Sequence, residues 1–296
     1  MMKCYLLFML CFSSRLFGQT ASDSTHEALF TIENTQFKSA GITLAGAIFK
    51  PRHPNAAVVI VHGSGQERKM AEVASLLAKK GIAVLTYDKR GVGESGGVYA
   101  GPEVGTNNID SANLNLLASD ASAAANKLSS SLKQKHVPLG LLGFSQAGWI
   151  IPMAAEKNSL INFIVIFSGP VVTSQEQLRF QFYTSGKSNF WDTHTEVEVR
   201  EHIKNDPDRY QFSGSDPRHA LTVLKIPGLW IYGGKDIQAP VGLSIERLDI
   251  FKAEGKPYDY QLFPSLGHNT ASSKTVNPMN IAIEWIKHIK KSMKSK

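Results

Sequence analysis

The stretch LLGFSQAG, residues 141–148, places a single serine, Ser145, at the end of an apolar run. Gly143 stands two residues before the serine, and Ala147 and Gly148 follow it at two and three residues. Small residues are needed there because larger side chains would collide across a sharp strand-to-helix turn. The common form of this turn has glycine in place of Ala147, and alanine is the smallest alternative. The stretch therefore predicts a turn that presents the Ser145 hydroxyl as a nucleophile.

Apolar runs alternate with amphipathic segments along most of the chain. Strands are expected within residues 56–63, 82–88, 137–145, 162–169, 226–236 and 258–268, and helices within 70–81, 112–132, 149–157, 243–253 and 277–291. Residues 29–34 and 43–51 are typical of an antiparallel edge hairpin. Repeated strand–helix alternation implies right-handed crossovers, so we expect an α/β fold with a mostly parallel central sheet and helices on both faces.

Residues 171–225 interrupt this alternation. The segment is long, polar and dotted with aromatic residues, and it contains no run of the buried-strand type. We interpret it as a cap insertion over the sheet rather than a second domain. The predicted organisation is thus a signal peptide over residues 1–19 and a single domain over residues 20–296.

The signal peptide is predicted from Lys3, the short apolar run of residues 4–12 and a polar, small-residue exit towards Thr20. The run is too short to span a membrane, and Arg15 interrupts its extension. We therefore expect a secreted or periplasmic protein without stable membrane insertion; an uncleaved membrane-surface anchor is the alternative. Cys4 and Cys11 are the two cysteines and both lie in this segment, so a disulfide or thiolate chemistry is not expected beyond it.

Composition and charge exclude several other classes. With 296 residues and 43% hydrophobic residues, the chain is able to bury a full core. The net charge of +7 is concentrated in residues 287–296, where lysines complement the dipole of a terminal helix, so no nucleic-acid partner is expected. The nine histidines include no H-E-x-x-H or paired-ligand spacing, and we expect no metal and no cofactor.

The loops that follow the expected strands carry the remaining candidates, because ligands bind beyond the carboxyl ends of parallel strands. Asp236 follows one strand in YGGKDIQAP, and His268 follows the last strand in FPSLGHNT. A histidine can take the proton of Ser145, and an aspartate can hold that histidine in the required tautomer. We expect these three residues to form a catalytic triad.

The glycine-rich loop VHGSGQ, residues 61–66, is expected to lie beside this triad. Its glycines allow close approach of the backbone, so we assign one oxyanion-hole donor to the N–H of Ser64, with Gly65 in reserve, and the other to the N–H of Gln146. His62 is expected to make a structural hydrogen bond and not to act as a base.

The order Ser145, Asp236, His268, together with the turn YDKRGVGESGG at residues 87–97, resembles the α/β-hydrolase superfamily over residues 37–289. The secreted esterase and serine-aminopeptidase-like branches are the most similar. The resemblance implies an α/β-hydrolase fold and hydrolysis of a carboxylic ester through an acyl-enzyme, with an amide or thioester as the alternative substrate. It also implies an architectural role for the following residues of that turn: Asp88, Arg90, Gly91, Gly93 and Ser95.

Two aromatic residues of the insertion, Phe180 and Trp191, are expected to contact a small-to-medium apolar acyl or leaving group. The alternative is that such rings only pack the insertion against the top of the sheet. A non-catalytic binding module of the same fold is a more distant alternative. Ester, amide and thioester substrates are not distinguished by the triad, because the pocket decides between them. Acyl chain length and oligomeric state are likewise not determined by the sequence.

Overall fold

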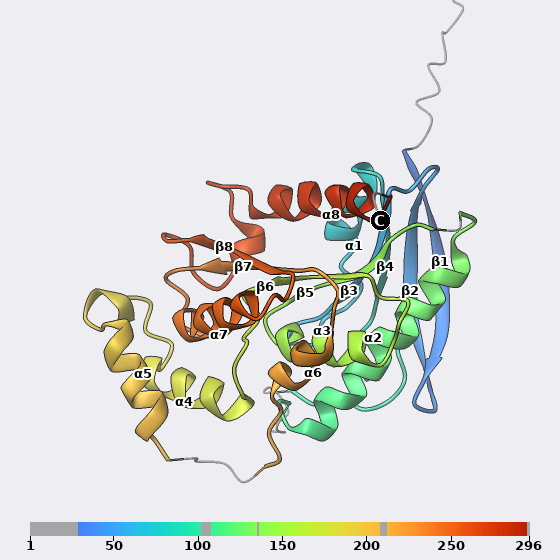
Figure 1. Ribbon diagram of the computed structural model, residues 1–296. Coiled ribbons are helices and arrows are strands. Elements are labelled where there is room, and N and C mark those ends of the chain that lie inside the picture. The colour runs from blue at the N-terminus through green and yellow to red at the C-terminus, as the bar shows by residue number, and fades with distance from the viewer. Residues whose placement is uncertain (1–28, 102–107, 135, 208–211, 295–296) are drawn as a thin grey trace, which may run out of the picture.

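A computed structural model describes residues 29–101, 108–134, 136–207 and 212–294. The predicted signal peptide, residues 1–19, lies outside the described residues. The described chain forms one eight-stranded sheet with helices on both faces (Figure 1). None of its helices is both long enough and apolar enough to span a bilayer.

The sheet has the order β1-β2-β4-β3-β5-β6-β7-β8. Its strands are β1 (Phe30–Ser39), β2 (Ile42–Pro51), β3 (Ala56–Val61), β4 (Ile82–Tyr87), β5 (Leu139–Phe144), β6 (Phe163–Phe167), β7 (Gly228–Gly233) and β8 (Tyr258–Phe263). β1 and β2 form the expected antiparallel hairpin, and β2 is also antiparallel to β4. From β4 to β8 all neighbours are parallel, which confirms the predicted fold class.

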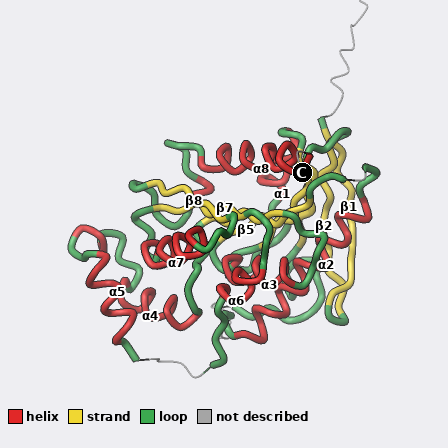
Figure 2. Tube along the Cα trace, in the orientation of Figure 1, coloured by secondary structure: helices red, strands yellow, loops and turns green. Residues whose placement is uncertain are grey.

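Two helical layers cover the sheet, α1 and α8 on one face and α2, α3, α6 and α7 on the other (Figures 1 and 2). The helices are α1 (Ala71–Lys79), α2 (Ser111–Ser131), α3 (Ala147–Glu156), α4 (Ser174–Thr184), α5 (Glu196–Asn205), α6 (Pro217–Val223), α7 (Val241–Ala253) and α8 (Pro278–Lys294), with short 3-10 turns η2 (Phe190–Asp192) and η3 (Thr270–Ser272). A separate apolar core lies on each face of the sheet. Every residue of β3 is buried, because this central strand is covered on both sides.

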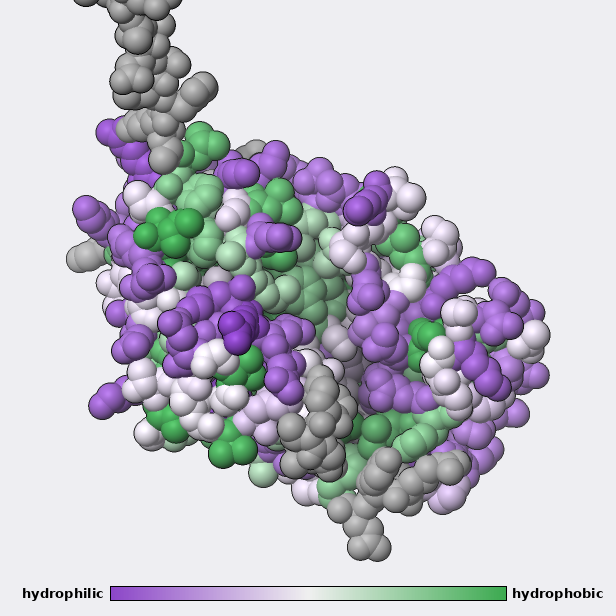
Figure 3. Space-filling model, turned by 180° about the vertical axis from the view of Figure 1, so that it is seen from behind, coloured by the Kyte–Doolittle hydropathy of each residue, from purple (hydrophilic) through white to green (hydrophobic). Residues whose placement is uncertain are grey.

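The insertion is helical and has its own small core. α4, η2 and α5 surround an apolar cluster that includes Phe180, Phe190 and Ile203. These helices project from one side of the molecule (Figure 1), whereas α6 packs against α3 and contributes Leu221 to the main core. Seen from behind (Figure 3), hydrophobic residues gather near a hollow in the middle of this face, and hydrophilic residues dominate the projecting part.

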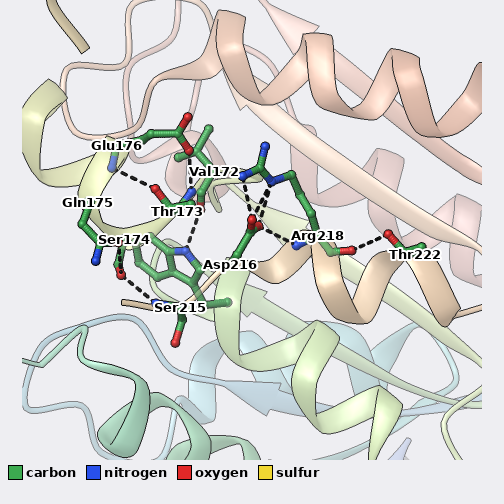
Figure 4. A network of polar contacts seen from close by, with 10 residues as sticks. Val172, Thr173, Ser174, Gln175, Glu176, Ser215, Asp216, Arg218 and Thr222 are labelled. Carbon is green, nitrogen blue, oxygen red and sulfur yellow. Dashed lines mark hydrogen bonds and ion pairs between the residues drawn. The ribbon is translucent and has the colours of Figure 1, made fainter. Parts of the chain in front are cut away.

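Hydrogen bonds join the two ends of the projecting segment. The Ser174 N–H donates to the Ser215 carbonyl at 3.0 Å, and the Ser215 N–H donates to Ser174 Oγ at 2.9 Å. Beside them, Thr173 caps α4 and Asp216 pairs with Arg218, so the exit and return of the insertion form one polar network (Figure 4). The insertion is thereby fixed to the body at its base.

The turn after β4 is held by its own polar groups. Asp88 accepts from the N–H groups of Lys69 and Glu94 at 2.9 and 3.0 Å. Ser95 Oγ donates to the Asp88 carbonyl at 2.6 Å and accepts from the Ala45 N–H. Gly91 and Gly93 have φ of 71° and 58°, values that suit glycine. These contacts are architectural, as the resemblance implies.

Arg90 anchors this turn to α2 through a buried ion pair. Its Nε and Nη2 donate to the two carboxylate oxygens of Asp120 at 3.0 and 2.6 Å. Burial raises the pKa of Asp120, although hydrogen bonds from Arg90 and Ser39 oppose that rise. The pair is fully enclosed, so either partner alone would be an uncompensated buried charge.

We expect Asp120→Ala to lower the free energy of unfolding by about 3–5 kcal/mol, because the Arg90 guanidinium is left buried without its partner. Urea unfolding followed by circular dichroism measures this change. The double variant Arg90→Met/Asp120→Ala should recover part of the loss. A single-variant loss below about 1 kcal/mol, the value of an exposed pair, would contradict the anchoring role.

Candidate active site

Ser145 lies on the turn between β5 and α3, at the carboxyl edge of the sheet. Its φ of 51° is in the left-handed region, which is uncommon for a residue with a side chain. A Cβ added at Gly143 would lie 2.5 Å from the Ala147 Cβ, and one at Gly148 would lie 2.6 Å from the Pro170 nitrogen. The small residues around Ser145 are therefore required by the space available.

The structure brings Ser145, His268 and Asp236 together in one chain of hydrogen bonds. His268 Nε2 lies 2.9 Å from Ser145 Oγ, and His268 Nδ1 lies 2.7 Å from Asp236 Oδ2. The three residues come from loops after β5, β8 and β7, separated by up to 123 positions in the sequence. With a proton on Nδ1, the Nε2 lone pair is directed at the serine hydroxyl.

Asp236 is buried, and its other carboxylate oxygen is also satisfied. Oδ1 accepts from the N–H groups of Gln238 and Ala239 at 2.7 and 2.9 Å. These two bonds fix the carboxylate plane, so that Oδ2 is left to face the imidazole. The acid therefore has one orientation, set by its own loop.

The insertion holds the same loop from outside. Three successive carbonyls accept hydrogen bonds from its side chains: Asp236 from Trp191 Nε1 at 2.7 Å, Ile237 from Thr184 Oγ1 at 2.7 Å, and Gln238 from Gln177 Nε2. Nothing in the sequence pattern predicted these bonds, because they join segments 45 to 61 residues apart.

Ser168 fixes the loop that carries His268, a role that the sequence pattern did not predict. Its Oγ donates to the His268 carbonyl at 2.5 Å and lies 3.1 Å from Thr270 Oγ1. Ser168 directly follows β6 and has φ of 51°, so it too occupies a strained position at the carboxyl edge. The sequence feature that could have indicated Ser168 is its position directly after a buried strand, where the site residues of a parallel sheet lie.

The predicted oxyanion donors flank the serine. Ser64 lines the same cavity as Ser145, and Gln146 is the next residue along the turn. Within the described chain neither backbone N–H donates a hydrogen bond, whereas the Gly63 N–H is occupied by Glu67 Oε2 at 3.2 Å. The Gly65 N–H likewise donates no hydrogen bond within the described chain, so Ser64 and Gln146, with Gly65 in reserve, stay the predicted donors.

His62 is not placed to act as a base. It is buried, and its ring packs edge-on against Tyr87 at 4.7 Å between centroids. Burial, reinforced by the charge of Lys89, lowers the pKa of His62 to about 3. The imidazole is therefore neutral at ordinary pH. Its Nε2 has no hydrogen-bond partner within the described chain, so the structural hydrogen bond expected of His62 is not found at that nitrogen.

A cavity of about 560 Å³ opens beside Ser145 and His268. Its apolar lining comes from α1 and the residue before it, from the ends of β5 and β6, from η3 and from the start of α8: Met70, Val73, Leu76, Phe144, Phe167, Ala271 and Met279. Two carboxylates, Glu67 and Glu72, also line the cavity. The cavity is thus mostly apolar with an acidic side, which suits a small organic ligand.

The expected substrate contacts of Phe180 and Trp191 do not agree with this placement. Phe180 is fully buried inside the core of the insertion, and neither residue lines the cavity. Trp191 instead uses its indole N–H to bind the Asp236 carbonyl. These side chains lie outside the cavity lining because their rings pack on one another and stabilise the insertion itself. The ring centroids of Phe180 and Trp191 are 6.2 Å apart.

A metal site is not formed by the described part of the chain, where no group of three or more histidine, cysteine or acidic side chains converges.

The sheet order and the site at its carboxyl edge define an α/β-hydrolase fold. A family model described as serine aminopeptidase, S33, matches residues 52–272. The chain belongs to this family.

Individual proteins are similar over different lengths. Esterase EstD of Thermotoga maritima is 26% identical over 252 residues, which is 75% of this chain and 58% of that esterase. The chain thus spans little more than half of that relative's length. Among solved structures, an esterase of Pyrococcus furiosus has a TM-score of 0.61 with 18% identity, covering 90% of this chain and 91% of the other. An acylaminoacyl peptidase of Pyrococcus horikoshii has a TM-score of 0.58 at 18% identity, covering 83% and 38%.

Proposed function

We propose that this protein is a serine hydrolase that cleaves carboxylic esters through an acyl-enzyme on Ser145. The observation that carries the proposal is the hydrogen-bond chain from Asp236 through His268 to Ser145 at the mouth of a mostly apolar cavity. The esterase relative and the family support the same class of reaction.

In the first half-reaction Ser145 Oγ attacks the ester carbonyl carbon while its proton passes to His268 Nε2. The carbonyl π electrons become an oxyanion, which accepts hydrogen bonds from the Ser64 and Gln146 N–H groups. Collapse of this intermediate breaks the bond to the alcohol, which leaves with the proton from His268. A water molecule then repeats the sequence on the acyl-enzyme, releases the acid and restores the Ser145 hydroxyl.

Each group has a distinct part in lowering the barrier. Asp236 stabilises the imidazolium and maintains its tautomer without taking the proton itself. An oxyanion donor of this kind contributes roughly 3–4 kcal/mol. Because the turn at Ser145 is fixed before substrate binds, little reorganisation is needed during the reaction.

Replacing the nucleophile tests the proposal directly. We expect Ser145→Ala to reduce kcat for p-nitrophenyl acetate at least roughly 1,000-fold with an unchanged circular dichroism spectrum, because the variant loses the hydroxyl that His268 activates. Activity above about one-tenth of the original in the folded variant would refute the assignment of Ser145.

The triad acid is tested by Asp236→Asn, which keeps the shape of the side chain but favours the wrong tautomer of His268. We expect kcat to fall by about 10⁴-fold. Asp249→Asn is the matched control, since Asp249 is an exposed aspartate on α7 whose carboxylate accepts a hydrogen bond from the Tyr260 hydroxyl at 3.4 Å. Equal activity of the two variants would show that Asp236 is not the acid.

The apolar wall of the cavity suggests substrates with small to medium apolar acyl groups. Leu76 is the outermost of the α1 residues on this wall, with 39% of its surface exposed. We infer that a longer acyl chain would cover Leu76, whereas an acetyl group would not reach it.

We therefore expect Leu76→Ala to lower kcat/KM for p-nitrophenyl octanoate relative to acetate by about 1–3 kcal/mol, or roughly 5- to 150-fold. Trp191→Phe is the contrasting variant. It loses the hydrogen bond to the carbonyl of Asp236, so it should lower kcat for every ester by a similar factor. The readout is an acetate-to-octanoate series on all three proteins. A change in selectivity with Trp191→Phe but not with Leu76→Ala would place the acyl pocket at the insertion instead.

An aminopeptidase activity on the same triad is the second candidate, favoured by the two carboxylates in the cavity wall. Either could bind a substrate α-ammonium group. Burial raises the pKa of Glu67, so its charge, and with it any ammonium binding at Glu67, would be lost at a higher pH than for an ordinary glutamate as the pH falls. Parallel assays on p-nitrophenyl esters and aminoacyl anilides separate the two activities.

A further inference from the structure

Lys89 is a buried lysine directly behind the glycine-rich loop. It follows β4 at the start of the Asp88 turn, and only 2% of its surface is exposed. Its Nζ donates to the carbonyls of Gly63 at 2.6 Å and Gly65 at 3.3 Å, and to Gln146 Oε1 at 3.2 Å. An ammonium group has three N–H donors and is costly to bury unless they are used. Such a residue is not explained by packing alone.

The loop that carries Ser64 is held at three successive carbonyls. Lys89 binds the first and the third, and Tyr99 Oη donates to the second, that of Ser64, at 2.8 Å. The Lys89 Nζ also lies 5.5 Å from the centre of the Tyr99 ring, within the range of a cation–π contact. Together the two side chains fix the orientation of the peptide planes in this loop.

This orientation decides where the Ser64 N–H points. The Gly63 carbonyl and the Ser64 N–H belong to one peptide unit, and in a trans peptide they point in opposite directions. Because Lys89 draws that carbonyl to its own side, the Ser64 N–H is directed away from Lys89. Lys89 does not line the cavity, whereas Gly63, Ser64 and Gly65 do. We infer from this that the Ser64 N–H faces the cavity.

The third bond of Lys89 reaches the segment that carries the other donor. Gln146 is buried, its Oε1 accepts from Lys89, and its Nε2 donates to the Asn108 carbonyl at 2.7 Å. The side chain of Gln146 is therefore fixed at both ends. A single ammonium group connects the loop of Ser64 to the turn of Gln146.

We propose that Lys89 is a positioning residue for the oxyanion site, which sets the distance and direction between the Ser64 and Gln146 N–H groups and adds a positive charge behind them. This inference rests on the proposed function, since it assigns Lys89 a part in the same reaction. Lys89 does not touch the substrate, and its effect is exerted through the two backbone segments that it binds.

The test compares Lys89→Met, which keeps the length of the side chain but removes its donors and charge, with Lys79→Met, an exposed lysine in the last turn of α1. Gln146→Met is the second variant: it removes the acceptor that links the two segments and retains the backbone N–H. Thermal unfolding establishes that each variant is folded. Steady-state kinetics with p-nitrophenyl acetate and inhibition by an alkyl trifluoromethyl ketone are then measured.

The ketone probes the oxyanion site specifically. Ser145 Oγ adds to its carbonyl carbon, the proton passes to His268, and the carbonyl electrons form a hemiketal oxyanion in the same place as that of the ester. We expect Lys89→Met to lower kcat about 10- to 100-fold with KM changed less than about threefold, and to weaken the ketone by a similar factor. Gln146→Met should show the same split with a smaller factor, and Lys79→Met should match the original protein.

Unchanged kcat and ketone affinity in folded Lys89→Met would overturn the inference. A change confined to KM would also overturn it, because a residue that positions the oxyanion donors acts on the transition state and therefore on kcat. Should Lys89→Met fail to fold, Gln146→Met decides: equal kcat and ketone affinity would again contradict the role of Lys89. Failure of the proposed function is distinguished from all of these, because the unmodified protein would then neither hydrolyse the ester nor bind the ketone.

Discussion

The left-handed backbone of Ser145 is the constraint on which the rest of the site depends. A residue with a side chain keeps such a conformation only where its surroundings over-determine it. Here the Ser145 N–H donates to the Phe167 carbonyl at 2.8 Å, and the Ser145 carbonyl accepts from the Gly148 N–H at 2.9 Å. The first bond ties the turn to β6 and the second starts α3. The serine hydroxyl is thereby lifted above the sheet edge towards His268.

Each of the other loops at this edge is shaped to meet that hydroxyl. In the loop that carries Asp236, the Gln238 and Ala239 N–H groups bind the carboxylate. A side chain of the insertion binds the Asp236 carbonyl. The histidine loop is held by Ser168. The glycine loop is held by Lys89 and Tyr99. In every case a carbonyl is bound by a side chain from a different part of the chain, so the precision of the site comes from tertiary contacts and not from the loops alone.

This difference explains what the sequence could predict. The strands, their helices and the loop positions of Ser145, Asp236 and His268 follow from local pattern, because a parallel sheet collects the ends of its strands at one edge.

The cavity wall does not follow from pattern. Met70 and Val73 lie on the apolar side of a segment with helical spacing, where a cavity lining and a core contact give the same residue types. The sequence indicates Phe180 and Trp191 only as aromatic residues of an insertion above the sheet, whereas in the structure Phe180 lies in the core of the insertion and Trp191 binds the loop of Asp236. Lys89 lies in a turn whose neighbours are architectural, and its contacts span up to 57 residues.

Trapping the covalent intermediate shows whether Ser145 carries the acyl group. The protein is mixed with p-nitrophenyl trimethylacetate, whose hindered acyl group is released slowly, quenched in acid and analysed by mass spectrometry. We expect a burst of p-nitrophenol equal to the enzyme concentration and one trimethylacetyl group on the peptide that contains Ser145. Turnover without a burst and with Ser145 unmodified, or an acyl group on a different residue, would contradict the assignment of Ser145.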